Sequence, residues 1–223
     1  GSAVAKPPVG SADPTIVNPA RLDHRGASRV CGQCHSTFLS PDQEDYLANG
    51  YRYQPGEDLS TAFETVLADS PLHTRMEQMG KPVYWTDGAC WVGGREYLGH
   101  VDSKCHTVGK MSCLSCHSMH DAPADDQLIS GMRGDRACLQ CHTGFTGSRL
   151  TQHTHHSAGS SGSRCYNCHM PHTSYALLGA IRSHRVDSPK VVSIRGGGRP
   201  NACSGRSEDE ATLFVEDGRA GRT

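Results

Sequence analysis

Cys113-Leu114-Ser115-Cys116-His117 follows the pattern C-x-x-C-H, and three more segments repeat it: Cys31-Gly32-Gln33-Cys34-His35, Cys138-Leu139-Gln140-Cys141-His142 and Cys165-Tyr166-Asn167-Cys168-His169. Two thiols three residues apart can bond to the two vinyl groups of one haem, and the histidine that follows then lies below the iron. A zinc site does not need a histidine after every second cysteine, and a thioredoxin-type motif occurs once, within a βαβ pattern that this sequence lacks. The repeated pattern therefore predicts four covalently bound haem c groups, each with its iron.

Each motif assigns three residues to one haem. The predicted attachment cysteines are Cys31, Cys34, Cys113, Cys116, Cys138, Cys141, Cys165 and Cys168. The predicted proximal iron ligands are His35, His117, His142 and His169. We number the motifs, and the haems that they would bind, from first to fourth along the chain.

The composition indicates that cofactors fill much of the interior. Of the 223 residues only 35% are hydrophobic and 6% aromatic, whereas 11 are cysteine and 14 histidine. This is a small supply of side chains for a conventional core in a chain of this length. We expect a mostly irregular fold with short α-helices around a compact haem pack and little β structure, limited to one hairpin.

Charge and hydropathy exclude several classes of protein. The chain has 22 basic and 23 acidic residues, a formal net charge of −1, and no basic block of the kind that binds nucleic acid. It contains no apolar run of about 18 residues, so we expect no transmembrane segment. Haem is attached through thioethers in exported compartments, which predicts a periplasmic or extracellular location. Residues 1–19 lack the features of an export signal, which we expect to be absent from this numbering.

The spacing of the motifs divides the chain into four parts. Residues 1–20 contain four prolines and are expected to form an extended arm. Residues 21–110 hold the first haem site and a stretch without motifs, residues 111–190 hold three haems, and residues 191–223 form a loop and a polar tail. Thr61 and Glu64 predict a capped helix through Ala68. Residues 83–85 and 95–97, around the turn at 86–88, predict the hairpin.

Parts of the sequence resemble known multihaem families. Residues 165–171, Cys-Tyr-Asn-Cys-His-Met-Pro, and the later stretch 183–189 resemble the family of pentahaem nitrite reductase and hydroxylamine oxidoreductase. Residues 28–203 look more similar still to cytochromes of the doubled C-x-x-C-H type. The resemblance implies that His184 ligates an earlier haem, such as the second. We expect the chain to leave a short helix just before His184. The Pro200-Asn201-Ala202-Cys203 run lacks the second cysteine and the histidine of a fifth site.

Ten histidines remain for the distal positions, and bis-histidine iron suits electron transfer because it has no open site. Besides His184, the preferred candidates are His120, three residues beyond His117 and so on one helical face with it, His153 or His156 ahead of the fourth motif, and His24. A surface or propionate-binding role is the alternative for each. Methionine ligation through Met119 or Met170 is a further alternative, and Arg182 or Arg185 could pair with a propionate. The remaining histidines are His73, His100, His106, His155 and His172.

Three cysteines lie outside the motifs. Cys90 and Cys105 are expected to form a disulfide across the hairpin. The alternative is a single-thioether haem site at Cys105-His106, and Cys203 would then be an odd thiol or an intermolecular link.

Together these features predict an electron-transfer protein and not an enzyme. It could act as a carrier, as a subunit of a complex or as a filament unit, with redox proteins, other multihaem cytochromes or further copies of itself as partners. The alternatives are a reductase of nitrite or hydroxylamine with one open haem, or a haem-based sensor.

Overall fold

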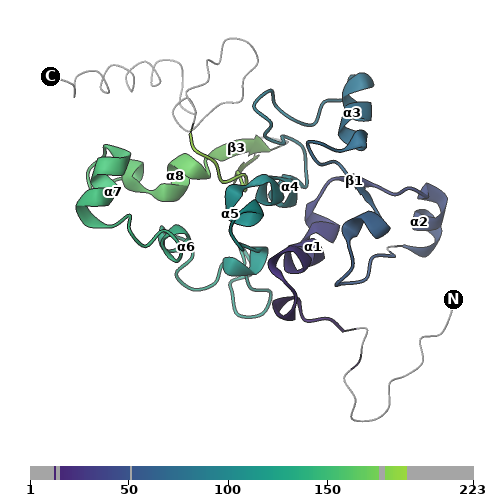
Figure 1. The fold of residues 1–223 in the computed structure, drawn as a ribbon, viewed down its shortest axis with the longest axis horizontal. Helices are drawn as coiled ribbons and strands as arrows, with labels where there is room; N and C mark the ends of the chain where they lie inside the picture. Colours follow the sequence, from purple (N-terminus) through teal and green to yellow (C-terminus); the bar gives the residue numbers. More distant parts are fainter. Residues whose placement is uncertain (1–12, 14–15, 51, 176–178, 190–223) are drawn as a thin grey trace.

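A computed structural model describes residues 13, 16–50, 52–175 and 179–189. It consists of short helices, loops and two small antiparallel strand pairs (Figure 1). The α-helices are α1 (His24–His35), α2 (Gln43–Asn49), α3 (Pro71–Gln78), α4 (Arg95–Asp102), α5 (Lys104–Thr107), α6 (Arg136–Leu139), α7 (Gly147–Thr154) and α8 (Cys165–His169). The 3-10 turns are η1 (Pro19–Arg21), η2 (Leu59–Thr61), η3 (Cys113–Ser115) and η4 (Ser161–Ser163), and the strands are β1 (Phe38–Leu39), β2 (Glu64–Thr65), β3 (His172–Tyr175) and β4 (Gly179–Arg182).

This architecture confirms the expected fold class, although neither of the two strand pairs is the predicted hairpin. β1 pairs with β2 and β3 with β4. The longest helix in the described ranges is α1, with 12 residues, and none there combines the length and apolar character that a membrane-spanning helix needs. Most of the predicted N-terminal arm, together with Cys203 and the polar tail, falls outside the described residues.

Conventional hydrophobic packing is concentrated in residues 36–102, which we call the protein-core region. One cluster contains Tyr53, Leu59, Phe63, Tyr97 and Leu98, and a second contains Val66, Leu72 and Val83. Val66 and Leu72 are 0% and 1% exposed. Its elements α2, α3 and β1 lie in the right-hand part of Figure 1, and α4 lies near the middle of the molecule.

Residues 111–189, which we call the motif-rich region, pack differently. Among its described residues the buried ones are Ser163 and Ser183, and no hydrophobic side chain there is fully buried. Its helices α6, α7 and α8 follow one another along the left-hand side of Figure 1 and are joined by turns and loops. The region thus has secondary structure without an apolar core of its own.

The helix predicted from Thr61 is wrong. Asp58, not Thr61, caps the local turn, because its carboxylate accepts a hydrogen bond from the amide of Ser60 at 3.0 Å. The chain then extends so that Phe63 and Val66 enter the two hydrophobic clusters, and Glu64 lies in β2. Burial of these side chains thus decides against the local capping pattern.

The predicted hairpin is correct in its turn and wrong in its second arm. Tyr84 bridges to Cys90, and the amide of Trp85 donates to the carbonyl of Ala89, so the chain returns at residues 89–91. Residues 95–97 instead begin α4, after Gly94 at φ +74°. A Cβ at Gly94 would lie 2.2 Å from the carbonyl carbon of Ser36, so only glycine permits this close approach.

Two further predictions of local structure are corrected in the motif-rich region. His120 does not share a helical face with His117, because η3 ends at Ser115 and residues 119–122 form bends. The segment before His184 is strand β4 instead of a short helix, and it pairs with β3. The β3–β4 hairpin therefore presents His184.

Candidate haem-binding site

The first motif lies at the end of α1, the longest described helix. Asp23 caps α1 by accepting a hydrogen bond from the amide of Gly26 at 2.7 Å. His24, Ser28, Cys31 and His35 recur at spacings of four, three and four residues, so they share one face of the helix. The capped helix therefore places a histidine and a hydroxyl in line with the attachment residues.

The second motif packs against this face. The Cys113 side chain lies beside that of Cys31 and lowers the pKa of the Cys31 thiol, so the first cysteines of the two motifs are neighbours. Beside this face of α1, a Cβ at Gly32 would lie 2.7 Å from the ring of Tyr97, so glycine lets α4 pack closely. The first and second haem sites are thus neighbours, next to the protein-core region.

The remaining motifs continue in sequence order. The side-chain amide of Gln140, in the third motif, donates a hydrogen bond to the backbone carbonyl of Ser115, in the second motif, at 3.3 Å. The side chains of Cys138 and Cys165 lie close enough for each to shift the pKa of the other, which places the third motif beside the fourth. The four motifs therefore form a row in the order first, second, third, fourth.

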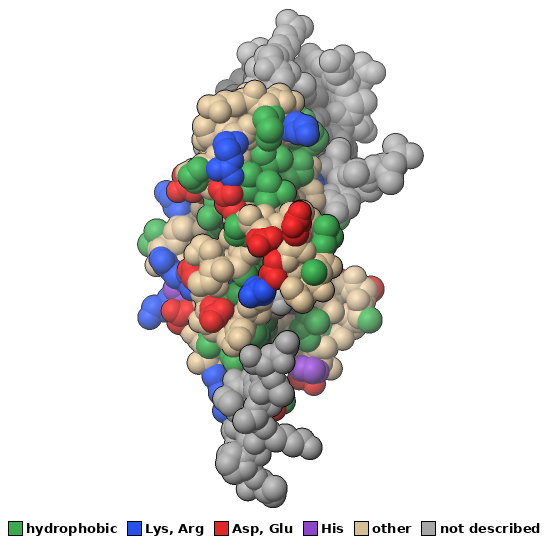
Figure 2. Space-filling model, turned by 90° about the vertical axis from the view of Figure 1, so that its right-hand side faces the viewer, with side chains coloured by type: hydrophobic (Ala, Val, Ile, Leu, Met, Phe, Trp, Pro, Cys, Tyr) green, Lys and Arg blue, Asp and Glu red, His purple; other side chains and the backbone are tan. Residues whose placement is uncertain are grey.

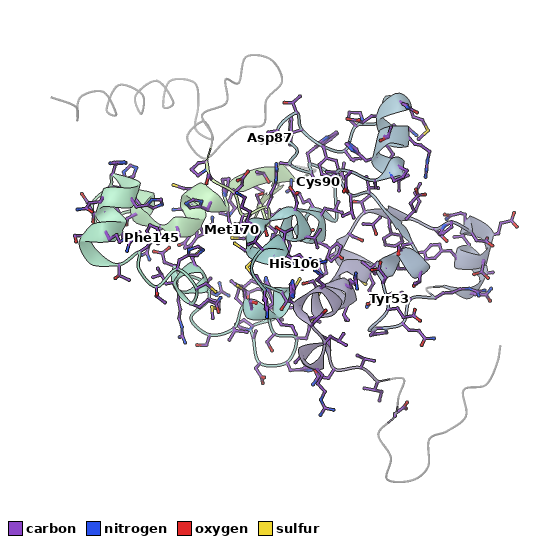
Figure 3. The ribbon with its side chains drawn as sticks, in the orientation of Figure 1. Tyr53, Asp87, Cys90, His106, Phe145 and Met170 are labelled. Carbon is purple, nitrogen blue, oxygen red and sulfur yellow. The ribbon has the colours of Figure 1, made fainter. Side chains whose placement is uncertain are left out.

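An aromatic ring lies between histidines of the third and fourth sites. The ring centre of Phe145 is 6.3 Å from that of His142 and 4.9 Å from that of His153. Figure 3 shows Phe145 beside α7, whereas His106 lies near the middle of the molecule.

Two of the proximal histidines face a second imidazole from a distant part of the chain. The ring centres of His117 and His184 are 6.2 Å apart with an interplanar angle of 26°, and those of His153 and His169 are 6.0 Å apart with an angle of 6°. Face-to-face contact would require about 3.5–4 Å. Two imidazoles that bind one metal ion from opposite sides, through bonds of about 2 Å, have ring centres about 6 Å apart.

Backbone hydrogen bonds fix the tautomer of three of these histidines. The Nδ1 atoms of His117, His169 and His184 lie 3.1, 2.9 and 3.1 Å from carbonyl oxygens of Asp126, Asp187 and Arg182. A carbonyl oxygen can only accept, so each Nδ1 carries the proton and each Nε2 keeps a lone pair for iron. Burial lowers the pKa of His184, which favours the neutral form that binds metals.

Three more histidines cluster beside the first two motifs. The ring centre of His106 is 4.9 Å from that of His24 and 4.7 Å from that of His100. Burial, with the nearby histidines as a smaller cause, lowers the pKa of His100 to about 3, and burial lowers that of His106. Sequence reasoning did not prefer His100 or His106 as distal ligands, and it considered His106 only within a single-thioether site at Cys105-His106. Their burial depends on the packing of α1 against α4, so no local pattern could have revealed it.

The three rings differ in whether their Nε2 atom is available to bind iron. Ser28 donates its only proton to the carbonyl of His24 at 2.9 Å, so the ring of His100, with Nε2 3.1 Å from the hydroxyl, donates to Ser28. His106 donates from Nδ1 to the carbonyl of Met111 at 2.9 Å, which leaves its Nε2 as an acceptor. The Nε2 atom of His24 is buried and has no hydrogen-bond partner among the described residues. His24 and His106 are therefore better suited than His100 to bind iron through Nε2.

The structure does not bring the other predicted ligands to a motif histidine in the same way. His120, His155, His156 and His172 are exposed, as His153 also is, and Met119 is 70% exposed. His155 caps the end of α7 in the left-handed conformation at φ +59°. His73 lies on α3 in the protein-core region, and its Nδ1 donates to the carbonyl of Ala68 at 2.8 Å. Met170 ends α8, and its carbonyl accepts a hydrogen bond from Arg182.

The expected disulfide is absent. Cys90 and Cys105 are both free thiols, and burial raises the pKa of each, that of Cys90 to about 11. The correction of the hairpin removes the geometry on which the pairing was based, since α4 now separates the two residues.

Both arginines that were considered as partners of a haem propionate contact other protein groups. Arg182 donates to the carbonyls of Tyr166 and Met170 at 3.2 and 3.1 Å, and its guanidinium lies over the Tyr166 ring. Arg185 pairs with Asp102. Both side chains connect protein segments, and a propionate contact by either one stays a prediction.

The donor set fits haem c: paired cysteines followed by a histidine with an available Nε2, and opposing imidazoles at two sites. A family model described as the doubled CXXCH motif matches residues 106–147, which contain the second and third motifs. No curated protein and no solved structure matches the chain. The match supports a multihaem c-type cytochrome, with haem c bound covalently at C-x-x-C-H motifs. It gives no support to a relationship with nitrite reductase or hydroxylamine oxidoreductase.

Proposed function

We propose that this protein carries four covalent haems and transfers electrons along them in motif order. The observation that carries the proposal is that two pairs of imidazole rings have centres about 6 Å apart. These pairs are His117 with His184 and His169 with His153. Each pair joins a motif histidine to one from another segment. Iron held on both sides by histidine is closed to substrate, which favours electron transfer over catalysis.

Contacts between motifs support the order of the haems. The side chains of Cys31 and Cys113 touch, as do those of Cys138 and Cys165, and Gln140 links the second and third motifs. Haems attached at these cysteines would lie close to one another, with the first and fourth at the ends of the row. We assign His24 or His106 as the distal ligand of the first haem.

The location and partners follow from the same chemistry. Thioether attachment favours an exported compartment, so we propose that the protein works in the periplasm or outside the cell, with other redox proteins or further copies of itself as partners. Figure 2 shows acidic and basic side chains interspersed on the face that it displays, without a large area of one charge. Electrons would enter or leave at the two ends of the row.

Mass spectrometry and electron paramagnetic resonance test the proposal together. The intact holoprotein should exceed the chain mass by four haem masses, and the ferric protein should be wholly low-spin. A mass excess of three or five haems contradicts the count. A stoichiometric high-spin signal would instead support the reductase alternative, because it reports an iron with an open position.

Substitution of the distal ligands tests the assignment. His184→Ala and His153→Ala should each retain four haems, turn one iron high-spin and allow that haem to bind carbon monoxide, and the double variant should open two. His73→Ala is the control, since His73 lies on α3 in the protein-core region, and it should remain low-spin. A wholly low-spin His184→Ala or His153→Ala would remove that histidine from the site.

A further inference from the structure

We propose that Arg185 is a positioning residue that holds His184 at the second haem by anchoring it to the protein-core region. The inference rests on the proposed role of His184 as a distal ligand. In this proposal, residues 83–102 help to position a ligand of the second haem, although they contribute no cysteine that attaches it.

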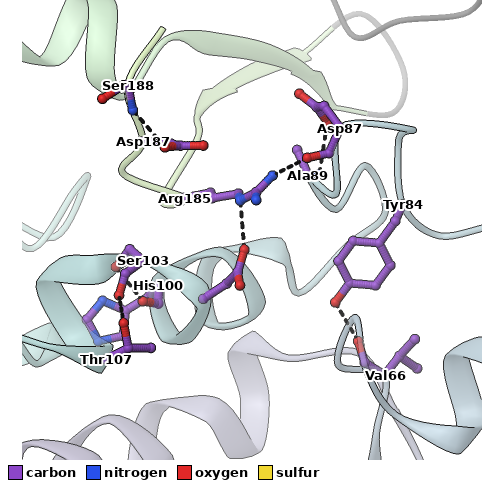
Figure 4. Close-up of polar contacts among 11 residues, drawn as sticks. Val66, Tyr84, Asp87, Ala89, His100, Ser103, Thr107, Arg185, Asp187 and Ser188 are labelled. Atoms are coloured by element: carbon purple, nitrogen blue, oxygen red, sulfur yellow. Dashed lines mark hydrogen bonds and ion pairs between the residues drawn. The ribbon is translucent and has the colours of Figure 1, made fainter. Parts of the chain in front are cut away.

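The guanidinium group of Arg185 reaches two different segments. Its Nε lies 2.7 Å from Oδ2 of Asp102 at the end of α4, and its Nη1 donates to the carbonyl of Asp87 at 2.6 Å (Figure 4). The Arg185 side chain is 20% exposed, so water weakens this pair less than it would a fully exposed one. The residue directly after His184 is thus fixed to a helix and to the 86–88 turn.

Two glycines allow the backbone to approach closely enough for these contacts. A Cβ at Gly99 would lie 2.6 Å from the amide nitrogen of Arg185 and 3.1 Å from the carbonyl carbon of His184. A Cβ at Gly88 would lie 3.3 Å from Nη1 of Arg185. The segment therefore rests directly on α4, where a larger residue at position 99 would displace it.

The hydrogen bonds of His184 itself are local. Its Nδ1 donates to the carbonyl of Arg182, and its own carbonyl accepts from the amide of Val186 at 3.0 Å. Such contacts orient the ring within residues 182–186 but do not set the position of this segment relative to His117. The long-range contacts of Arg185, to residues 83 and 98 positions earlier in the chain, do so.

A merely structural ion pair would predict a different result. Partly exposed ion pairs contribute little to overall stability, so loss of Arg185 should have a small effect on unfolding in either case. A positioning residue should in addition change how often His184 leaves the iron. Because apparent affinity scales with the fraction of the open state, carbon monoxide binding to the ferrous protein measures this fraction.

The experiment compares substitutions in the holoprotein. Arg185→Met should keep four haems and raise the apparent carbon monoxide affinity of one haem by about tenfold, as expected for the loss of charge-assisted hydrogen bonds. Arg185→Lys should give a smaller increase, because one ammonium group cannot match both contacts of the planar guanidinium. Gly99→Ala should act in the same direction by displacing the segment.

Arg75→Met is the matched control, since Arg75 forms a partly exposed ion pair with Glu64 in the protein-core region, away from the motif histidines. It should leave carbon monoxide binding unchanged. If Arg185→Met does not fold, Asp102→Asn replaces it, because this change weakens one contact and keeps the other. Wild-type binding in Asp102→Asn and Gly99→Ala would then overturn the proposal.

His184→Ala separates this inference from the proposed function. If His184→Ala opens one haem while Arg185→Met behaves like Arg75→Met, the ligand assignment stands and the role of Arg185 is wrong. If His184→Ala opens no haem, the ligand assignment itself is wrong. An opened haem in both His184→Ala and Arg185→Met supports the positioning role.

Discussion

The protein-core region and the motif-rich region differ in what stabilises their interiors. The first buries Tyr53, Phe63, Val66 and Leu72 in two hydrophobic clusters. The second buries no hydrophobic side chain among its described residues and carries three of the four haem motifs. Ordering each residue costs about 1–2 kcal/mol of backbone entropy, so a region without apolar burial needs another source of stability.

Haem is that source in our interpretation. A covalently attached macrocycle offers a large apolar surface, and its iron ties segments together through histidines that lie far apart in the sequence. The difference between the regions teaches that low hydrophobic content need not mean disorder when cofactor motifs are dense. Residues 111–189 should therefore depend on haem, and residues 36–102 should not.

Removal of the second haem should have the largest effect. The double variant Cys113→Ala, Cys116→Ala should lose one haem mass and lower Tm by about 10 °C or more, since a loss of about 3 kcal/mol shifts Tm by about 6–12 °C in a chain of this size. Hydrogen exchange should rise in residues 111–189 and stay close to wild type in 53–98. Normal thermal stability without that haem would contradict its role as a core.

A cavity in the protein-core region should have the next largest effect. Leu72→Ala should lower the free energy of unfolding by about 2–4 kcal/mol, because Leu72 is 1% exposed within the second hydrophobic cluster. Chemical denaturation measures the loss, and the haem content should remain four with an unchanged low-spin spectrum. Loss of haem in this variant would show that the two regions are not independent.

Surface ion pairs should have the smallest effect in both regions. Arg75 pairs with Glu64 in the protein-core region, and Arg133 pairs with Asp125 in the motif-rich region, with all four side chains more than a third exposed. Arg75→Met and Arg133→Met should each change the free energy of unfolding by less than about 1 kcal/mol. A larger change in one region would identify ion pairs as a further difference between them.

Sequence reasoning was most successful where the chemistry is local. The C-x-x-C-H spacing identified the haem motifs, and the doubled-motif match supports this interpretation. The sparse hydrophobic composition indicated short helices and little sheet, which the structure confirms. It was least successful where burial competes with a local signal, as at Thr61, where the core captures Phe63 and Val66.

The sequence by itself determined where haem can be attached, because both thiols and the proximal histidine lie within five residues. Only the tertiary structure decided which distant histidines meet them. His184 reaches His117 because β4 pairs with β3 and Arg185 rests on α4, and His100 and His106 are buried because α4 packs against α1. Such meetings depend on contacts between segments far apart in the chain, and a short sequence window does not contain them.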